Sequence, residues 1–265
     1  MANRIDETFR EAKDSGKIIL APFITVGFPN VAKSEAIASA VLKAGADLIE
    51  LGVPFSDPLA EGPTIQKTSF LALQQGVTVQ TCLDVVKRLR KQGLESPMIL
   101  MGYFNPYLHF GLARFAKDAS ISGVDGLIVP DLPVEESDVF QEMCKDNNLH
   151  LIPLLAPTST EERIVQACKR ANGFIYCVSL TGVTGARNDL SEGLPKLVSK
   201  IRKHTDLPIM VGFGVSNYEH VKTIAQFADG VVVGSALLDA IDKAPNNRVA
   251  HRASEFVREL LGDSN

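Results

Sequence analysis

The sequence predicts a single (β/α)8 barrel, in which eight parallel strands alternate with helices and close into a cylinder. Three observations lead to this prediction. Short aliphatic runs alternate with longer helical patterns eight times along the 265 residues. No linker or shift in composition interrupts the alternation, so we expect residues 1–265 to form one domain. Several strand runs are apolar at nearly every position, as is typical of parallel strands covered on both faces.

The expected strands are short apolar runs, many bounded by glycine, proline or polar residues. They are Ile18–Thr25, Leu48–Gly52, Met98–Gly102, Gly126–Val129, Leu151–Leu155, Phe174–Ser179, Ile209–Gly212 and Gly230–Val233. Helical periodicity predicts helices at Ser34–Ala44, Thr64–Leu73, Thr81–Lys91, Ala113–Ser120, Glu135–Asn147, Thr160–Arg170, Leu194–His204, Tyr218–Phe227 and Arg248–Leu261. An extra helix, Ile5–Lys13, precedes the first strand. A doubly wound open sheet is the alternative arrangement, but eight units of similar length favour closure.

Composition excludes several classes of protein. The 27 basic and 31 acidic residues give a net charge of −4, which argues against binding to nucleic acid. No segment predicts a membrane span, and the charged N-terminus lacks the apolar run of an export signal. The four cysteines lack CxxC spacing, which indicates reduced thiols in the core of a cytoplasmic protein. The five histidines show no ligand spacing, so we expect no metal site.

In a barrel of this kind the reactive groups lie at the carboxyl ends of the strands. In the second predicted strand, Ile49 and Leu51 share one face, and Glu50 lies on the other. If the two aliphatic side chains pack on the helices, Glu50 points into the mouth of the barrel. Desolvation among apolar neighbours would raise its pKa and suit it to proton transfer near neutrality, although a strand-end glutamate can also simply reach solvent.

The proline-rich loop after this strand brings Asp57 and Glu61 to the same mouth. Glu61 alone could be merely solvated, but beside Glu50 it makes a pair of carboxylates that can divide acid and base roles. No lysine lies inside or at the carboxyl end of a predicted strand, so a Schiff-base mechanism lacks its nucleophile. Carboxylates are therefore expected to carry the proton chemistry, with Tyr103 and Tyr176 as the nearest polar aromatic side chains.

Glycine-rich turns follow the last three predicted strands, at residues 181–185, 212–217 and 234–236. A helix that begins at Ser235 would direct its amide groups at a phosphate, as the last loops of such barrels often do. The long loop 180–193 carries Thr184 and Arg187, and we expect it to be a lid over the substrate.

Several strings of residues resemble one family. Glu50 is followed by Leu-Gly-Val-Pro-Phe-Ser-Asp-Pro-Leu-Ala, and further strings of this kind occur in order along the chain. They are Pro22–Thr25, Gly62–Gln66, Asp131–Ser137, Leu154–Thr158, Gly182–Ala186, Gly212–Gly214 and Gly234–Ala236. On these strings the sequence is similar, over essentially its whole length, to the tryptophan synthase α subunit family.

The resemblance implies a lyase of tryptophan biosynthesis that cleaves indole-3-glycerol phosphate to indole and glyceraldehyde 3-phosphate by a retro-aldol reaction. It implies a β subunit as partner, in an α2β2 assembly. No cofactor is expected in this chain, and pyridoxal phosphate is expected only in the β partner. Breaking the bond needs a proton on indole C3, a base for the glycerol hydroxyl and a partner for the indole N–H, which two carboxylates can supply.

The family pattern assigns roles to positions of this sequence. Glu50 would be the principal acid and base, and Glu61 would assist at the indole nitrogen, although the family usually has aspartate there. The remaining assignments are Phe23, Ile65, Tyr176 and Phe213 on the indole side, and Gly185, Gly214, Gly234 and Ser235 at the phosphate. The surface for the β subunit is expected at Pro54, Asp57, Asn105 and Pro133, with apolar area from Phe55, Leu59, Phe104 and Tyr107.

Two other functions stay open. Another phosphate-binding barrel, such as an isomerase of the same pathway, would need a different acid–base pair. A catalytically impaired regulatory subunit, suggested by the glutamate at position 61, would bind substrate and activate a β partner without turnover. Release of indole by the chain alone would separate these hypotheses.

Overall fold

The barrel is closed in the computed structural model, which describes residues 2–178, 193–212 and 214–263. Its strands are β1 (Ile19–Thr25), β2 (Ile49–Gly52), β3 (Met98–Met101), β4 (Gly126–Ile128), β5 (His150–Ile152), β6 (Leu154–Leu155), β7 (Ile175–Val178), β8 (Ile209–Gly212) and β9 (Gly230–Val233). They form one sheet in the order β5-β4-β3-β2-β1-β9-β8-β7-β6, and all the pairings are parallel. The two ends of this order, β5 and β6, follow one another in the chain, so the sheet curls back on itself. The predicted barrel is confirmed, and the open sheet is excluded.

The fifth predicted strand, Leu151–Leu155, is divided in the structure. Pro153 separates β5 from β6 because proline has no N–H to donate to a strand ladder. Its carbonyl still accepts a hydrogen bond from the amide of Tyr176 at 3.1 Å. The two short strands therefore occupy one position in the barrel, with β5 on β4 and β6 on β7.

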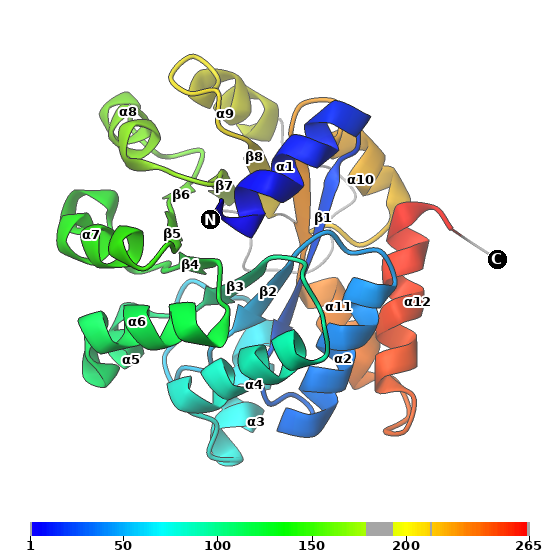
Figure 1. Ribbon diagram of the computed structural model, residues 1–265. Coiled ribbons are helices and arrows are strands. Elements are labelled where there is room, and N and C mark those ends of the chain that lie inside the picture. Colours follow the sequence, from blue (N-terminus) through cyan, green and yellow to red (C-terminus); the bar gives the residue numbers. More distant parts are fainter. Residues whose placement is uncertain (1, 179–192, 213, 264–265) are drawn as a thin grey trace.

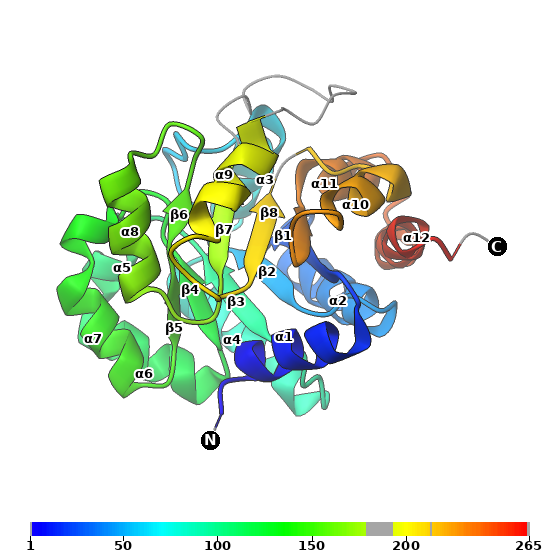
Figure 2. The ribbon, with the colours of Figure 1, turned by 90° about the horizontal axis from the view of Figure 1, so that it is seen from above.

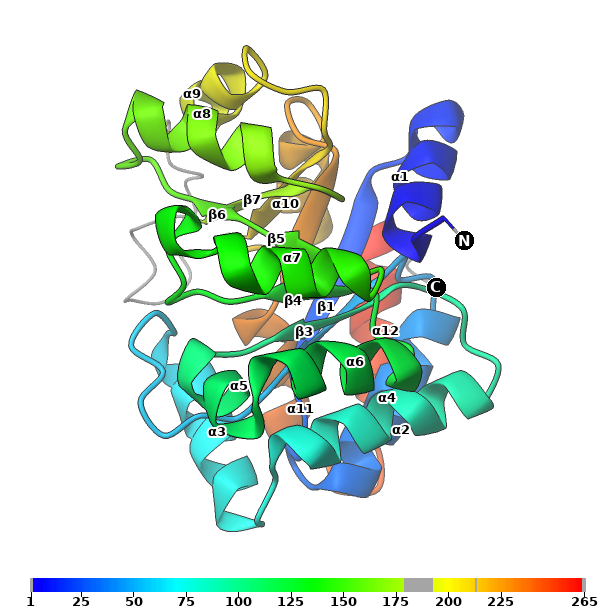
Figure 3. The same ribbon diagram turned by 60° about the vertical axis from the view of Figure 1, so that its left-hand side comes forward.

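Helices surround the sheet on its outer side, except for α1, which lies across one end of the barrel (Figures 1 and 3). They are α1 (Arg4–Ser15), α2 (Val31–Lys43), α3 (Pro63–Gln74), α4 (Val79–Lys91), α5 (Phe104–Phe110), α6 (Leu112–Ser122), η1 (Val134–Glu136), α7 (Asp138–Asp146), α8 (Glu161–Arg170), α9 (Gly193–Ile201), α10 (Tyr218–Ile224), α11 (Ser235–Asp242) and α12 (Val249–Leu261). In the described part of the chain, no helix combines the length and the apolar character needed to cross a membrane.

Some helix boundaries differ from those expected, for local reasons. α2 begins at Val31 rather than Ser34, because the Asn30 side chain caps it by accepting a hydrogen bond from the Lys33 amide. α5 was missing from the prediction, which treated Asn105 and Pro106 as part of a loop. Proline is compatible with a helix within its first turn, where the amide groups have no partner in the helix.

The end of the barrel that holds the strand beginnings is closed by α1 (Figure 2). The Asn3 side chain donates hydrogen bonds to the carbonyls of Asp125 and Asn148, both at 2.9 Å. The buried Asp125 carboxylate pairs with Arg90 and Arg4 and accepts a hydrogen bond from the amide of Met98. This end is filled and paired, so the opposite end, where the strands finish, is the one that can receive a ligand. That residues 1–265 form one domain stays a prediction.

Candidate active site

Glu50 lies inside the barrel, as the alternation along its strand predicts. It stands on β2 between Phe23 of β1 and Ile99 of β3, and its exposed fraction is 0%. Burial raises the pKa of Tyr176 on β7, and the Glu50 carboxylate raises it further. Because β2 and β7 lie on opposite sides of the closed sheet, this electrostatic interaction crosses the interior of the barrel.

The carboxyl group of Glu50 is isolated among its neighbours. Both of its oxygens are buried, and neither has a hydrogen-bond partner in the described part of the chain. Burial raises its pKa well above the ordinary value, and the nearby Glu61 carboxylate raises it further. Both effects favour the protonated form of this carboxyl group, which can donate a proton.

Glu61 belongs to the loop between β2 and α3 and lines a small cavity at the mouth of the barrel. Burial raises its pKa to about 7. The two carboxyl groups differ in burial, because Glu61 is partly exposed and Glu50 is not. Two carboxyl groups in such different surroundings can divide the roles of acid and base at one site.

The cavity beside Glu61 is lined by side chains from three neighbouring strands and α3. Phe23 and Ile65, both expected on the indole side, lie there, together with Met101, Tyr103 and the loop residue Phe55. Met101 was not predicted as a site residue, and it is found only because it ends β3 at the mouth. The walls are largely apolar, which suits a planar aromatic ligand.

Two glycines near the last strands lie beside predicted indole-side residues: Gly212 beside Tyr176, and Gly234 beside Phe23 and Ile65. Tyr176 is buried, and a Cβ on Gly212 would lie 2.3 Å from its hydroxyl oxygen, so Gly212 leaves room for this ring. A Cβ on Gly234 would lie 3.5 Å from Phe23 and 3.7 Å from Ile65, which places the expected phosphate residue beside the expected indole residues.

Ser235 begins α11, and the residue before it, Gly234, has no side chain with which to cap the helix. Among the described residues no side chain accepts from its first amide groups, which can therefore receive an anion, in keeping with the predicted phosphate site. Gly214 has a φ of +48°, in the left-handed region that favours glycine, and open space where a Cβ would stand. Phe213, Gly185, Thr184 and Arg187 lie outside the described residues, as does most of the predicted lid.

The predicted partner surface is only partly exposed. Asp57, Asn105 and Pro133 are exposed, but Pro54 is buried, so its side chain cannot contribute surface. Of the apolar residues expected there, Leu59 is 90% exposed, whereas Tyr107 is fully buried and stacks on Phe115. The prediction for Tyr107 was therefore wrong, because it lies on the inner side of a helix that was not foreseen.

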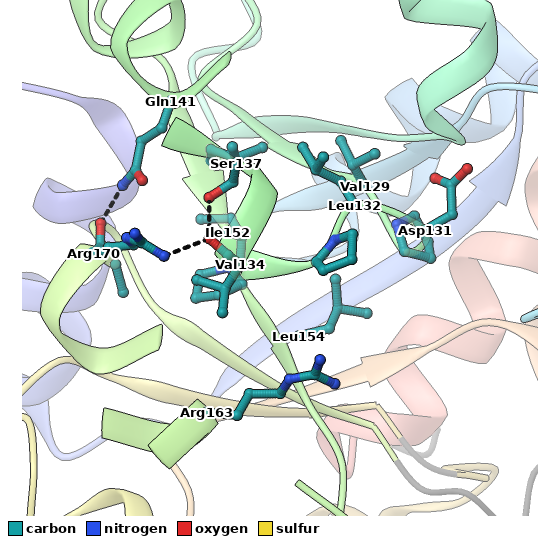
Figure 4. A pocket seen from close by; sticks show the side chains of 15 residues that line it. Val129, Asp131, Leu132, Val134, Ser137, Gln141, Ile152, Leu154, Arg163 and Arg170 are labelled. Carbon is teal, nitrogen blue, oxygen red and sulfur yellow. Dashed lines mark hydrogen bonds between the residues drawn. The ribbon is translucent and has the colours of Figure 1, made fainter. Parts of the chain in front are cut away.

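A larger hollow of about 240 Å³ lies outside the barrel, between η1, α7 and α8 (Figure 4). Its two arginines already have partners: Arg163 pairs with Glu135, and Arg170 pairs with Asp138 and donates to the carbonyl of Val134. This hollow is larger than the cavity beside Glu61, but the two carboxyl groups with raised pKa values lie at the mouth. The mouth is the candidate active site.

Fold and site together define the class of protein. No group of side chains suited to holding a metal ion occurs among the described residues. The barrel holds a buried carboxyl group, a second carboxyl group beside it and the start of a helix without a side-chain cap at the same mouth. This combination is typical of an enzyme that moves protons on a phosphorylated substrate.

The comparisons with known proteins identify the family. The family model described as tryptophan synthase alpha chain matches residues 9–262, and the chain belongs to this family. It is 46% identical over 260 residues to the tryptophan synthase alpha chain of Roseiflexus castenholzii, which covers 98% of this chain and 100% of that one.

Solved structures agree. A structure of Mycobacterium tuberculosis tryptophan synthase is 36% identical, covers 99% of this chain and 98% of that one, and has a TM-score of 0.91. A chain of the tryptophan synthase α2β2 complex of Pyrococcus furiosus is 37% identical, covers 92% of this chain and 98% of that one, and has a TM-score of 0.87. The resemblance noted in the sequence is thereby confirmed.

Proposed function

We propose that this chain cleaves indole-3-glycerol phosphate to indole and glyceraldehyde 3-phosphate, with Glu50 as acid and base and Glu61 as the partner of the indole nitrogen. It is a carbon–carbon lyase of the tryptophan synthase alpha chain family. The observation that carries the assignment is the Glu50 carboxyl group, which is fully buried, has no hydrogen-bond partner in the described chain and lies close to a second carboxylate.

The proton balance of the reaction fits one carboxyl group used twice. The neutral acid of Glu50 protonates indole C3, and the Glu50 carboxylate that results takes the proton of the hydroxyl on the adjoining glycerol carbon. As the aldehyde forms, the bond from C3 to that carbon breaks and its electron pair returns to the ring. Glu50 ends the cycle protonated, so no outside acid or base is consumed.

Glu61 is suited to the charge that develops on the ring. Protonation of C3 makes the indole nitrogen electron-poor, and an ionised Glu61 would accept a hydrogen bond from its N–H. With a pKa of about 7, the group is about half ionised at neutral pH. Its side chain is one methylene longer than the aspartate usual in the family, so the position of its backbone must suit that length.

The other end of the substrate would bind at the amide groups of α11 and the adjoining glycines. Gly234 and Ser235 contribute from the described residues, Gly214 follows the neighbouring strand β8, and Gly185 completes the expected set. A phosphate held there would use binding energy remote from the reacting bond to position the indole over Glu50.

A β subunit is the proposed partner, since the relative from Pyrococcus furiosus is described as an α2β2 complex. The exposed Asp57, Asn105 and Pro133 are proposed to contact it. We expect no cofactor in this chain, pyridoxal phosphate in the β partner, and a cytoplasmic location. The four cysteines are buried free thiols, which supports that location.

The test is release of indole by the purified chain with and without a β subunit. Glu50→Gln should lower kcat by about 10²–10⁴-fold or more and leave KM nearly unchanged, since the substitution keeps the shape and removes the proton. Glu95→Gln is the matched control, because that carboxylate pairs with Arg4 at the far end of the barrel. Near-normal turnover in Glu50→Gln would exclude the mechanism, and absence of turnover in the unaltered chain would favour the regulatory alternative.

A further inference from the structure

The loop that carries Glu61 has no regular structure of its own to hold it. It joins β2 to α3, and within the described part of the chain the backbone hydrogen bonds of its tip are short-range ones, from the Leu59 amide to the Asp57 carbonyl and from the Glu61 amide to the Pro58 carbonyl. Leu59 is 90% exposed, so burial of an apolar side chain does not fix the tip. Something else must hold the Glu61 backbone in place.

Side chains from outside the loop supply that support. At its start, the Ser69 hydroxyl accepts a hydrogen bond from the Phe55 amide at 2.9 Å and donates one to the Phe55 carbonyl at 3.0 Å. At its end, the Gln66 side chain donates to the carbonyl of Glu61 at 2.9 Å. Both of these supports come from α3, which follows the loop directly.

Tyr103 provides the support that comes from a separate part of the barrel. It follows β3 and is 7% exposed. Its hydroxyl accepts a hydrogen bond from the amide of Ala60, the residue before Glu61, at 2.8 Å. Its ring stacks on Phe55 with 5.0 Å between centroids. One side chain thus contacts both the start and the end of the loop.

We propose that Tyr103 is a positioning residue: it holds the loop so that the Glu61 carboxyl group stays partly buried at the mouth and within reach of the substrate nitrogen. This inference rests on the proposed function, in which Glu61 contacts the substrate. Tyr103 acts through the backbone of Ala60, and for this purpose it need not touch the substrate.

The chemistry of the hydroxyl agrees with this role. Burial raises the pKa of Tyr103 to about 12, although the hydrogen bond from the Ala60 amide lowers it, and Glu61 and Asp131 add smaller increases, so the group stays protonated at neutral pH. As a neutral group it accepts the Ala60 N–H without placing a second negative charge beside Glu61. Loosening the loop would expose the Glu61 carboxyl group to water and bring its pKa down from about 7.

The titratable groups that face Glu61 are known from their electrostatic contributions. Among residues 2–178, 193–212 and 214–263 they are Glu50 on β2, Tyr103 after β3 and Tyr176 on β7. Burial raises the pKa of Glu50 and of Tyr176 far above their ordinary values. Because the pKa of Glu61 is about 7, we expect its titration to contribute to any change near pH 7, and Glu61→Gln identifies that contribution by removing it.

The experiment compares the pH dependence of kcat/KM for indole release by the full chain and its variants. Tyr103→Phe removes the hydroxyl and keeps the ring that stacks on Phe55. Tyr107→Phe is the matched control, because that buried hydroxyl has no hydrogen-bond partner in the described chain and lies in the same segment. Glu61→Gln identifies the part of the profile that depends on Glu61, and thermal unfolding verifies that each variant is folded.

We expect Tyr103→Phe to lower kcat about fivefold, the order expected for one lost hydrogen bond, with KM little changed. The acidic limb near pH 7 should move to lower pH, while Tyr107→Phe keeps the profile of the unaltered chain. A Tyr103→Phe profile that coincides with the parent would overturn the proposal. So would a loss of rate with an unmoved limb, because a merely structural contribution would give that result.

The failure of the proposed function has a different signature. If Glu61→Gln keeps both the rate and the acidic limb, Glu61 has no part in the reaction, and the inference about Tyr103 falls with it. If Glu61→Gln loses the limb and Tyr103→Phe resembles the parent, the role of Glu61 stands and only the positioning inference is refuted.

Discussion

Glu61→Gln should stabilise the folded chain at alkaline pH, because the carboxyl group is held at the mouth at a cost in desolvation. Burial raises its pKa from 4.5 to about 7 in the folded chain. The folded state therefore binds this proton more tightly than the unfolded state does, and its contribution to stability is complete below pH 4.5. That contribution is lost as pH rises from the unfolded pKa through the folded one.

The size of the effect follows from the shift. A difference of about 2.5 pH units, at about 1.36 kcal/mol per unit, is about 3 kcal/mol. This is an upper limit, since Glu61 is partly exposed. Glutamine has nearly the same shape and does not titrate. The free energy of unfolding of Glu61→Gln should therefore exceed that of the parent by up to about 3 kcal/mol above pH 7, and the excess should shrink towards pH 4.5.

Urea unfolding between pH 5 and pH 8 measures this difference directly. Asp57→Asn is the control, because that carboxylate lies in the same loop and is exposed. Its effect on stability should change much less over the same range. A Glu61→Gln effect that is flat with pH would refute the view that desolvation sets the pKa of Glu61.

Three further predictions concern other parts of the molecule. Ser235→Glu should raise KM at least tenfold with a smaller change in kcat, because a negative side chain at the start of α11 would repel the phosphate. Steady-state kinetics of indole release test this, and an unchanged KM would mean that the phosphate binds elsewhere. Asp57→Lys should weaken association with a cognate β subunit, and without that subunit its activity should stay within about tenfold of the parent's. A binding titration of the two chains tests the first part, and an unchanged affinity would place the interface elsewhere. Asp125→Ala should lower the free energy of unfolding by about 3–5 kcal/mol, because it leaves Arg90 without its buried carboxylate partner. Urea unfolding measures this loss, and a value under about 1 kcal/mol would contradict the prediction.

The barrel could be predicted from the sequence because its signal is repeated. Each strand run and each helical pattern is local, and eight repetitions leave few arrangements. The position of Glu50 inside the barrel could be predicted for a similar reason: its apolar neighbours Ile49 and Leu51 lie on the other face of the strand. The details that failed depend on single residues, such as the break at Pro153 and the helix that begins at Phe104.

The sequence by itself determined the fold class, the family and the position of the principal carboxylate, because periodicity and short motifs are read along the chain. Only the tertiary structure decided which side chains meet. It paired Tyr103 with the amide of Ala60 across 43 positions of the sequence, and it buried Tyr107 and Pro54, which had been expected at a surface. The raised pKa values of Glu50 and Glu61 likewise come from burial, and the burial of a side chain depends on residues that are distant in sequence and adjacent only after folding.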